Sequence, residues 1–130
     1  MSLRLLALAA AAAAAASGAS AQSLAPQAVY ADNCAACHQP TGKGVKGAFP
    51  ALAGDPFVLA PPPQVIAVVL NGRGGMPAFK DELSDAQLAA AITYVRTAWG
   101  NKAKPVSSAD VAKVRLAVRA APKAKSLQAH

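Results

Sequence analysis

The sequence predicts an all-α protein with a single domain, and three observations support this fold class. Apolar residues recur at spacings of three and four along residues 84–100 and again along residues 111–118, as on one face of a helix. No segment alternates apolar and polar residues as a half-buried strand does. The stretches between the periodic segments are rich in glycine and proline and are expected to be loops.

Residues 1–21 have the features of a secretory signal peptide. Arg4 precedes an unbroken apolar run over residues 5–16, which is shorter than the roughly 20 residues that span a bilayer. Small residues ending in Ala21 then form the A-x-A pattern of a cleavage site. We therefore expect a periplasmic protein whose mature chain begins after Ala21, with an uncleaved N-terminal anchor as the alternative.

Two helices are predicted in the first half of the mature chain. The first extends over Pro26–Asn33, with Val29 and Tyr30 among its buried residues, and leads directly into a cysteine motif. The second begins in the proline run 61–63, because proline suits the first positions of a helix, and ends near Asn71.

The stretch LSDAQLAAAITYVRTAWG predicts the clearest helix of the chain. Ser84 and Gln87 have the spacing of a capping box, and Asp85 suits the positive end of the helix dipole. Gly100 is the expected stop signal. The predicted apolar face consists of Leu88, Ala91, Ile92, Val95 and Trp99.

Both cysteines, Cys34 and Cys37, lie in the stretch CAACH directly before His38. A disulfide here would close too small a loop to constrain the unfolded chain much. A thioredoxin-like redox pair would need alternating strands and helices, and a zinc site would need every cysteine and histidine of the mature chain, including the last residue, His130. The C-x-x-C-H spacing instead indicates covalent haem attachment, with His38 as one axial ligand of the iron. A chance match is the alternative.

The second axial ligand is predicted to be Met76. Iron bound by His and Met is six-coordinate and suits electron transfer. Met1 leaves with the signal peptide, so Met76 is the one methionine of the mature chain. It lies in the stretch NGRGGMPAF, whose glycines allow close approach to a flat ligand. A packing role for Met76, or ligation by His130 or a lysine, are the alternatives.

The loop between residues 39 and 54 is expected to be irregular and to place apolar side chains against the porphyrin. These side chains are Phe49, Pro50 and Leu52. Because residues 22–100 are few for a self-sufficient core, a covalently bound porphyrin would complete the packing.

The positive charge of the chain is concentrated at its C-terminal end. The formal net charge is +7, yet residues 22–100 contain five basic and five acidic residues. Residues 101–130 contain seven basic residues and one acidic residue, Asp110.

A short helix and a loose end are predicted within this basic extension. Val111, Val114 and Val118 recur at helical spacing, and Ser107 or Ser108 is the expected cap. Three interpretations remain open. The helix can dock on the rest of the protein, it can form a docking arm for an acidic redox partner, or it can make peripheral contact with anionic lipid. Nucleic acid is excluded as a partner because the protein is exported.

The stretches CAACH, FPALAG, GRGGMPAF and LSDAQLAAAITYVRTAWGN together resemble class I c-type cytochromes, over about Val29–Asn101. The resemblance implies an all-α fold in which an N-terminal and a C-terminal helix cross beside one haem. Residues 22–100 would then form the cytochrome c domain and residues 101–130 a basic extension. The resemblance also implies thioether bonds at Cys34 and Cys37, with His38 and Met76 as axial ligands.

Further roles are implied by the same resemblance. The Pro50 carbonyl would accept a hydrogen bond from the second nitrogen of His38 and make it a better ligand. Asn71 and Arg73 would lie near the Met76 loop or a haem propionate. The segment after Trp99 is similar to small cytochrome c subunits of periplasmic dehydrogenases and reductases, although those often have a longer insert before the methionine.

The sequence therefore predicts an electron carrier with one haem c rather than an enzyme. It would take one electron from a donor, such as a dehydrogenase, to a terminal acceptor, such as a reductase or an oxidase. No Ser/His/Asp set, carboxylate pair or phosphate-binding loop is visible. The alternative is a haem enzyme or gas-binding sensor in which Met76 is displaceable.

Overall fold

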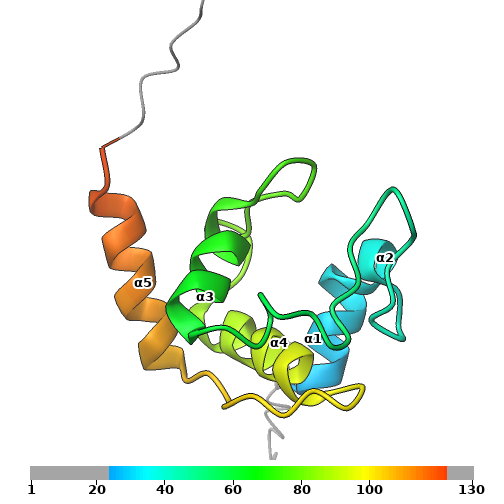
Figure 1. The fold of residues 1–130 in the computed structure, drawn as a ribbon. Helices are drawn as coiled ribbons and strands as arrows, with labels where there is room; N and C mark the ends of the chain where they lie inside the picture. Colours follow the sequence, from blue (N-terminus) through cyan, green and yellow to red (C-terminus); the bar gives the residue numbers. More distant parts are fainter. Residues whose placement is uncertain (1–23, 123–130) are drawn as a thin grey trace, which may run out of the picture.

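The computed structural model describes residues 24–122, and this part of the chain is built from helices and loops (Figure 1). Within it no β-strand forms, and the two isolated β-bridges join Val45 to Phe49 and Arg73 to Met76. The predicted all-α fold is therefore confirmed. The helices are α1 (Pro26–Asn33), α2 (Ala35–His38), α3 (Pro62–Asn71), α4 (Asp85–Thr97) and α5 (Ser108–Ala120). None of these described helices is long and apolar enough to cross a membrane.

α4 lies at the centre of the fold, and its predicted N-terminal cap is present. The Ser84 hydroxyl accepts a hydrogen bond from the Gln87 amide at 3.2 Å, and the Gln87 side chain accepts one from the Ser84 amide at 3.0 Å. The helix ends earlier than predicted, at Thr97, because Ala98 is extended and Trp99 is left-handed (φ 53°). The Trp99 indole thereby turns aside to donate a hydrogen bond to the Pro40 carbonyl at 3.0 Å.

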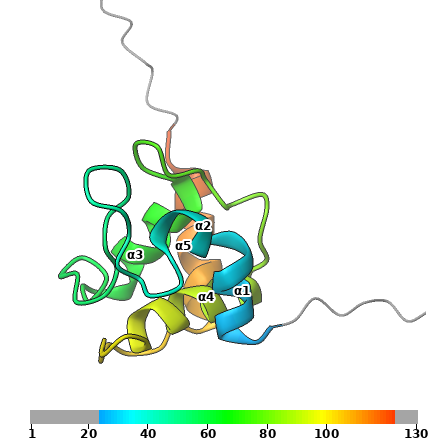
Figure 2. The same ribbon diagram turned by 90° about the vertical axis from the view of Figure 1, so that its right-hand side faces the viewer.

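Two hydrophobic clusters pack on α4. The first joins α3, α4 and α5, and its centre is formed by Leu70, Leu88 and Val111, none of which is exposed at all. The second joins α1 to α4 through Tyr30 and Val95. The two clusters hold α1 and α2 on one side of the molecule and α3 on the other, with α4 below (Figures 1 and 2).

Three aromatic side chains connect the loop after α2 to the second cluster. The rings of Tyr30, Tyr94 and Trp99 contact one another with centroid distances of 5.1 to 5.4 Å. The Tyr30 hydroxyl donates a hydrogen bond to the Gln39 carbonyl at 2.6 Å. The segment that follows the cysteine motif is therefore anchored at its start.

The C-terminal helix α5 is docked on α3 and α4 along the outer edge of the molecule (Figure 1). Ser107 caps it together with Asp110, and Val114 and Val118 pack against the first cluster. The hydrophobic core thus continues across residue 100, where the charge of the sequence changes. The predicted loose end comprises residues 120–130, of which those from residue 123 onward lie outside the described residues, as does the predicted signal peptide.

Candidate functional site

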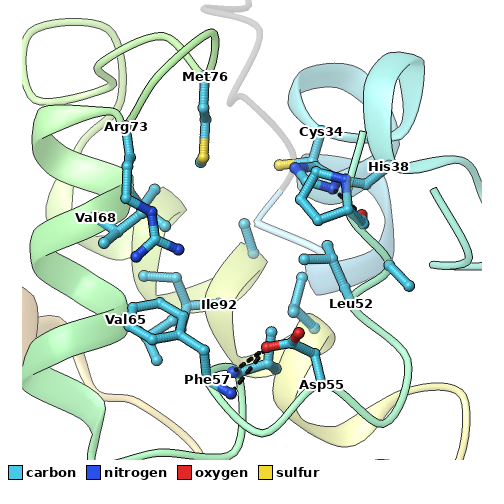
Figure 3. Close-up of a pocket in the computed structure, with 16 residues that line it drawn as sticks. Cys34, His38, Leu52, Asp55, Phe57, Val65, Val68, Arg73, Met76 and Ile92 are labelled. Atoms are coloured by element: carbon cyan, nitrogen blue, oxygen red, sulfur yellow. Dashed lines mark hydrogen bonds between the residues drawn. The ribbon is translucent and has the colours of Figure 1, made fainter. Parts of the chain in front are cut away.

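A cleft opens between α2 and α3, with α4 as its floor (Figure 3). Sixteen residues line it, and all except His38, Asp55 and Arg73 have apolar or sulfur-containing side chains. The walls include Leu52 and Val58 on one side, Val65, Val68 and Val69 from α3 on the other, and Ala91, Ile92 and Val95 from α4 below. Such a surface suits a flat apolar ligand.

His38 is fixed in the cleft wall at the end of α2. It is 9% exposed, and its Nδ1 lies 2.9 Å from the Pro50 carbonyl oxygen. A carbonyl oxygen can only accept a hydrogen bond, so Nδ1 carries the proton and Nε2 keeps a free lone pair. The hydrogen bond that the resemblance implied is therefore present, and it selects the tautomer able to bind a metal through Nε2.

Met76 reaches the cleft from the opposite wall. Its sulfur points inward, across the cleft from the His38 ring (Figure 3). The loop that carries it is closed by two backbone hydrogen bonds between Arg73 and Met76, of 3.0 and 3.2 Å. The structure thus brings a nitrogen donor and a sulfur donor, 38 positions apart in the sequence, to opposite sides of one apolar space.

The two cysteines are not joined by a disulfide and lie on the His38 side of the cleft. Cys34 lines the cleft, whereas Cys37, one helical turn later, is partly exposed and is not among the lining residues. Burial, and then the neighbouring Cys37, raise the pKa of the Cys34 thiol to about 11. Burial thus disfavours the thiolate form of Cys34, which is the form that reacts in redox-active pairs.

Asp55 and Phe57 also line the cleft, and sequence reasoning missed both. The Asp55 carboxylate accepts hydrogen bonds from the amides of Phe57 and Val58 at 2.8 and 3.1 Å. The Arg73 guanidinium lies 4.5 Å above the Phe57 ring centroid. The Asp-Pro pair at positions 55–56 is a turn signal that could have identified this wall.

The loop before Asp55 differs from its prediction at one position. Pro50 and Leu52 line the cleft as expected, but Phe49 is 41% exposed and is not a lining residue. Phe49 pairs with Val45 in a tight turn, through backbone hydrogen bonds of 2.8 Å in both directions. The structure therefore places Phe49 outside the lining of the cleft. Of the two residues expected near the Met76 loop, Arg73 lines the cleft and Asn71, at the end of α3, does not.

Asn101 is a further residue that sequence reasoning missed. It is buried, donates hydrogen bonds to the carbonyls of Leu52 at 3.1 Å and Val95 at 2.7 Å, and accepts one from the Gly54 amide at 2.7 Å. It therefore joins the loop of the cleft wall to α4. No local sequence pattern predicts the role of Asn101, because its partners lie 6 to 49 positions away.

The donor set and the cleft surface match one group of protein families. The model for "Cytochrome C oxidase, cbb3-type, subunit III" matches residues 21–95. The chain belongs to this family of c-type cytochromes. The cofactor of this c-type cytochrome is accordingly haem c, its helices form the class I cytochrome fold, and its role lies in electron transfer.

Similar proteins include both dehydrogenase subunits and small cytochromes. The chain is 39% identical over 100 residues to the alcohol dehydrogenase (quinone) cytochrome c subunit of Gluconobacter oxydans, which matches 67% of this chain and 21% of that protein. It is 35% identical over 107 residues to cytochrome c-552 of Thermus thermophilus, covering 67% of this chain and 81% of that one. It is 41% identical over 81 residues to cytochrome c6 of Leptolyngbya boryana, covering 58% and 91%.

The chain spans about a fifth of the length of the dehydrogenase subunits and most of the length of the small cytochromes. The family therefore establishes the cofactor and the type of reaction. It leaves the donor and the acceptor to be argued separately.

Proposed function

We propose that this c-type cytochrome is a periplasmic electron carrier in which His38 and Met76 are the axial ligands of one haem c. The orientation of His38 carries most weight: the hydrogen bond to Pro50 leaves Nε2 free on the side of the cleft that faces the Met76 sulfur. The bound haem would supply an iron that gains and loses one electron. His38 and Met76, on opposite walls of the cleft, would both hold the iron, and this favours a carrier over an enzyme.

The remaining residues of the site have simpler proposed roles. Cys34 and Cys37 form the thioether bonds. The apolar walls from α3 and α4 exclude water from the iron, and Pro50 orients the His38 ring and raises its basicity as a ligand. Arg73 places a positive charge in the cleft, where it can pair with a carboxylate of the cofactor.

Two variants at position 76 test the proposed axial ligands. Met76→Leu keeps the apolar volume but removes the sulfur, whereas Met76→His supplies another ligand. In the holoprotein, Met76→Leu should abolish the long-wavelength charge-transfer band of Met-ligated ferric iron and should admit cyanide rapidly. Met76→His should also lose the band but stay closed to cyanide. Prompt binding of cyanide or CO by the unmodified protein would instead support a haem enzyme or gas sensor.

Two further measurements test the covalent attachment of haem to the cysteines and the removal of the signal peptide. Haem should stay with the polypeptide on a denaturing gel, and the double variant Cys34→Ala, Cys37→Ala should lose it. The N-terminal peptide should begin at Gln22 by mass spectrometry, as expected for removal of residues 1–21. A peptide that retains the apolar run would support the uncleaved anchor.

The proposed electron donor is a dehydrogenase. Several of the similar proteins are named as cytochrome subunits of alcohol, gluconate or fructose dehydrogenases. The protein can be either a subunit of a dehydrogenase complex or a carrier that diffuses freely. To distinguish these, the native protein is purified at low salt and its haem absorbance is followed through a sizing column. Haem that elutes with larger chains supports a complex subunit, and haem that elutes at monomer size supports a diffusing carrier.

A basic face is proposed to guide docking to the donor. Among residues 101–122, the exposed positive residues are Lys102, Lys104, Lys113 and Arg119. Reversal of Lys113 and Arg119 to Glu should slow reduction by the donor several-fold at low salt, with the difference vanishing at high salt. The same reversal at Lys43 and Lys46, in the loop after α2, is the comparison. If only that second variant slows reduction, the donor docks at the loop instead.

A further inference from the structure

The docked helix α5 contributes one charged side chain to the interior of the molecule. Arg115 is only 9% exposed, although it is an arginine on the outermost helix. A buried guanidinium is costly unless its N–H groups have partners. The partners of Arg115 therefore indicate what this part of the chain holds in place.

Arg115 has three partners on the segment that leads into α4. Its Nε forms an ion pair with the Asp85 carboxylate at 2.7 Å. One terminal nitrogen donates to the Leu83 carbonyl at 2.9 Å and the other donates to the Lys80 carbonyl. The three bonds reach one carboxylate and two backbone carbonyls, all within residues 80–85. The guanidinium therefore binds a single short segment.

This segment is the returning limb of the loop that carries Met76. On its other side it is held to α3, because the Phe79 amide donates to the Val69 carbonyl at 3.1 Å and the Lys80 amide donates to the Leu70 carbonyl at 3.2 Å. Lys80 is thus bonded through its amide to α3 and through its carbonyl to Arg115 of α5. Only three residues separate this anchor from Met76.

We propose that Arg115 is a positioning residue for the sixth iron ligand: α5 fixes the returning limb at Lys80, and this keeps the Met76 sulfur in the cleft. The inference rests on the proposed role of Met76. Without Arg115 the limb would lose its polar contacts with α5, and local opening of the loop would withdraw the sulfur more often. The C-terminal extension would then be a part of the haem site, acting through the loop.

The test compares two arginines of α5 in the holoprotein. Arg115→Gln removes the grip, and Arg119→Gln, one turn later and exposed, removes the same charge. We expect Arg115→Gln to bind cyanide in the ferric state at least about tenfold faster than the unmodified protein, which corresponds to about 1.4 kcal/mol in loop opening. Its Met-to-iron charge-transfer band should be weakened. Arg119→Gln should change neither quantity, and Arg115→Lys should give an intermediate rate.

Another variant distinguishes a loss of global stability from a specific loss of Met76 positioning. Tyr30→Phe removes a hydrogen bond on the His38 side, 2.6 Å long, and leaves the Met76 side untouched. If it speeds cyanide binding as much as Arg115→Gln at equal loss of unfolding free energy, the positioning role is wrong. Should Arg115→Gln fail to fold, Asp85→Asn weakens the same grip and should shift the rate in the same direction; no shift would overturn the inference.

The two proposals fail in different ways. If Met76→Leu leaves the cyanide rate and the charge-transfer band unchanged, Met76 is not the ligand and the proposed function fails. If Met76→Leu has the expected effect but Arg115→Gln behaves like Arg119→Gln, only the role of α5 is overturned.

Discussion

A β-carbon at Gly44 would lie 2.5 Å from the Pro50 carbonyl oxygen, the atom that accepts the hydrogen bond from His38. It would lie 2.3 Å from the Phe49 carbonyl oxygen as well, and Gly44 has a left-handed φ of 61°. Only glycine fits this position without moving the backbone on which the His38 ring depends.

Gly44→Ala should therefore raise the midpoint potential of the haem. A displaced Pro50 carbonyl weakens the hydrogen bond, which makes His38 a poorer electron donor and destabilises the ferric state more than the ferrous state. A tenfold difference between the two states corresponds to about 59 mV for one electron, and we expect a rise of up to this size. Spectroelectrochemical titration measures it.

Gly47→Ala is the matched control for this experiment. Gly47 also has a left-handed φ, of 79°, but no atom lies within 4 Å of a β-carbon built there. The Gly47→Ala variant therefore introduces similar backbone strain without a contact to Pro50. Equal shifts of the potential in both variants would contradict the role given to the Pro50 carbonyl.

Gly72→Ala should loosen Met76 from the other end of its loop. A β-carbon at Gly72 would lie 2.4 Å from the Met76 carbonyl oxygen, so the turn that joins Arg73 to Met76 would have to open. We expect faster cyanide binding to the ferric protein, by about tenfold or more. Gly74→Ala, with a left-handed φ of 58° but open space around it, should have a clearly smaller effect. The reverse order would show that backbone strain alone controls the loop.

Asn101→Ala should lower the free energy of unfolding by about 3 kcal/mol, because it leaves one amide and two carbonyls of the interior without their partner. Denaturant unfolding followed by haem absorbance measures this change. Asn33→Ala is the comparison, since Asn33 is partly exposed and donates one bond, to the Val29 carbonyl at 2.8 Å. A cost for Asn101→Ala no greater than that for Asn33→Ala would contradict the proposed link between the cleft wall and α4.

Tyr30 should make the protein less stable in strong alkali. Burial, followed by Cys34 and Tyr94, raises the pKa of Tyr30 to about 12, from an ordinary value of 10.0. Because the pKa is higher in the folded protein, this contribution is fully present below pH 10 and is lost as the pH rises to about 12, amounting to roughly 2–3 kcal/mol. Unfolding measured between these pH values should show the loss, and Tyr30→Phe should lack this part of it. An equal decline in both proteins would exclude Tyr30 as the cause.

Local patterns were sufficient to predict much of this fold. α1 was predicted with its observed bounds, and the α4 cap at Ser84 follows from a two-residue pattern that needs no tertiary contact. His38 and Met76, which the structure places in the lining of one cleft, could be singled out because each lies in a short sequence motif. Each of these predictions depends on neighbours in the sequence.

The parts that sequence reasoning missed depend on distant neighbours. The helix α4 ends before the predicted stop at Gly100, and Trp99, which leaves the helical pattern, donates a hydrogen bond to Pro40, 59 positions earlier. In the sequence alone, Arg115 is indistinguishable from the other basic residues of the extension, because its partners lie 30 to 35 positions away. The exposure of Phe49 follows from a turn pairing that an apolar residue type does not reveal.

The division of the core into two clusters has a consequence for the order in which the molecule is made. A chain is synthesised from its N-terminus, so Cys34, His38 and the loop through Pro50 emerge well before Arg115. The helix α3 cannot complete its packing until Val111 is available. The α3 wall of the cleft can therefore complete its packing only after α5 has been made, whereas the contacts of α1 with α4 through Tyr30 and Val95 do not require α5.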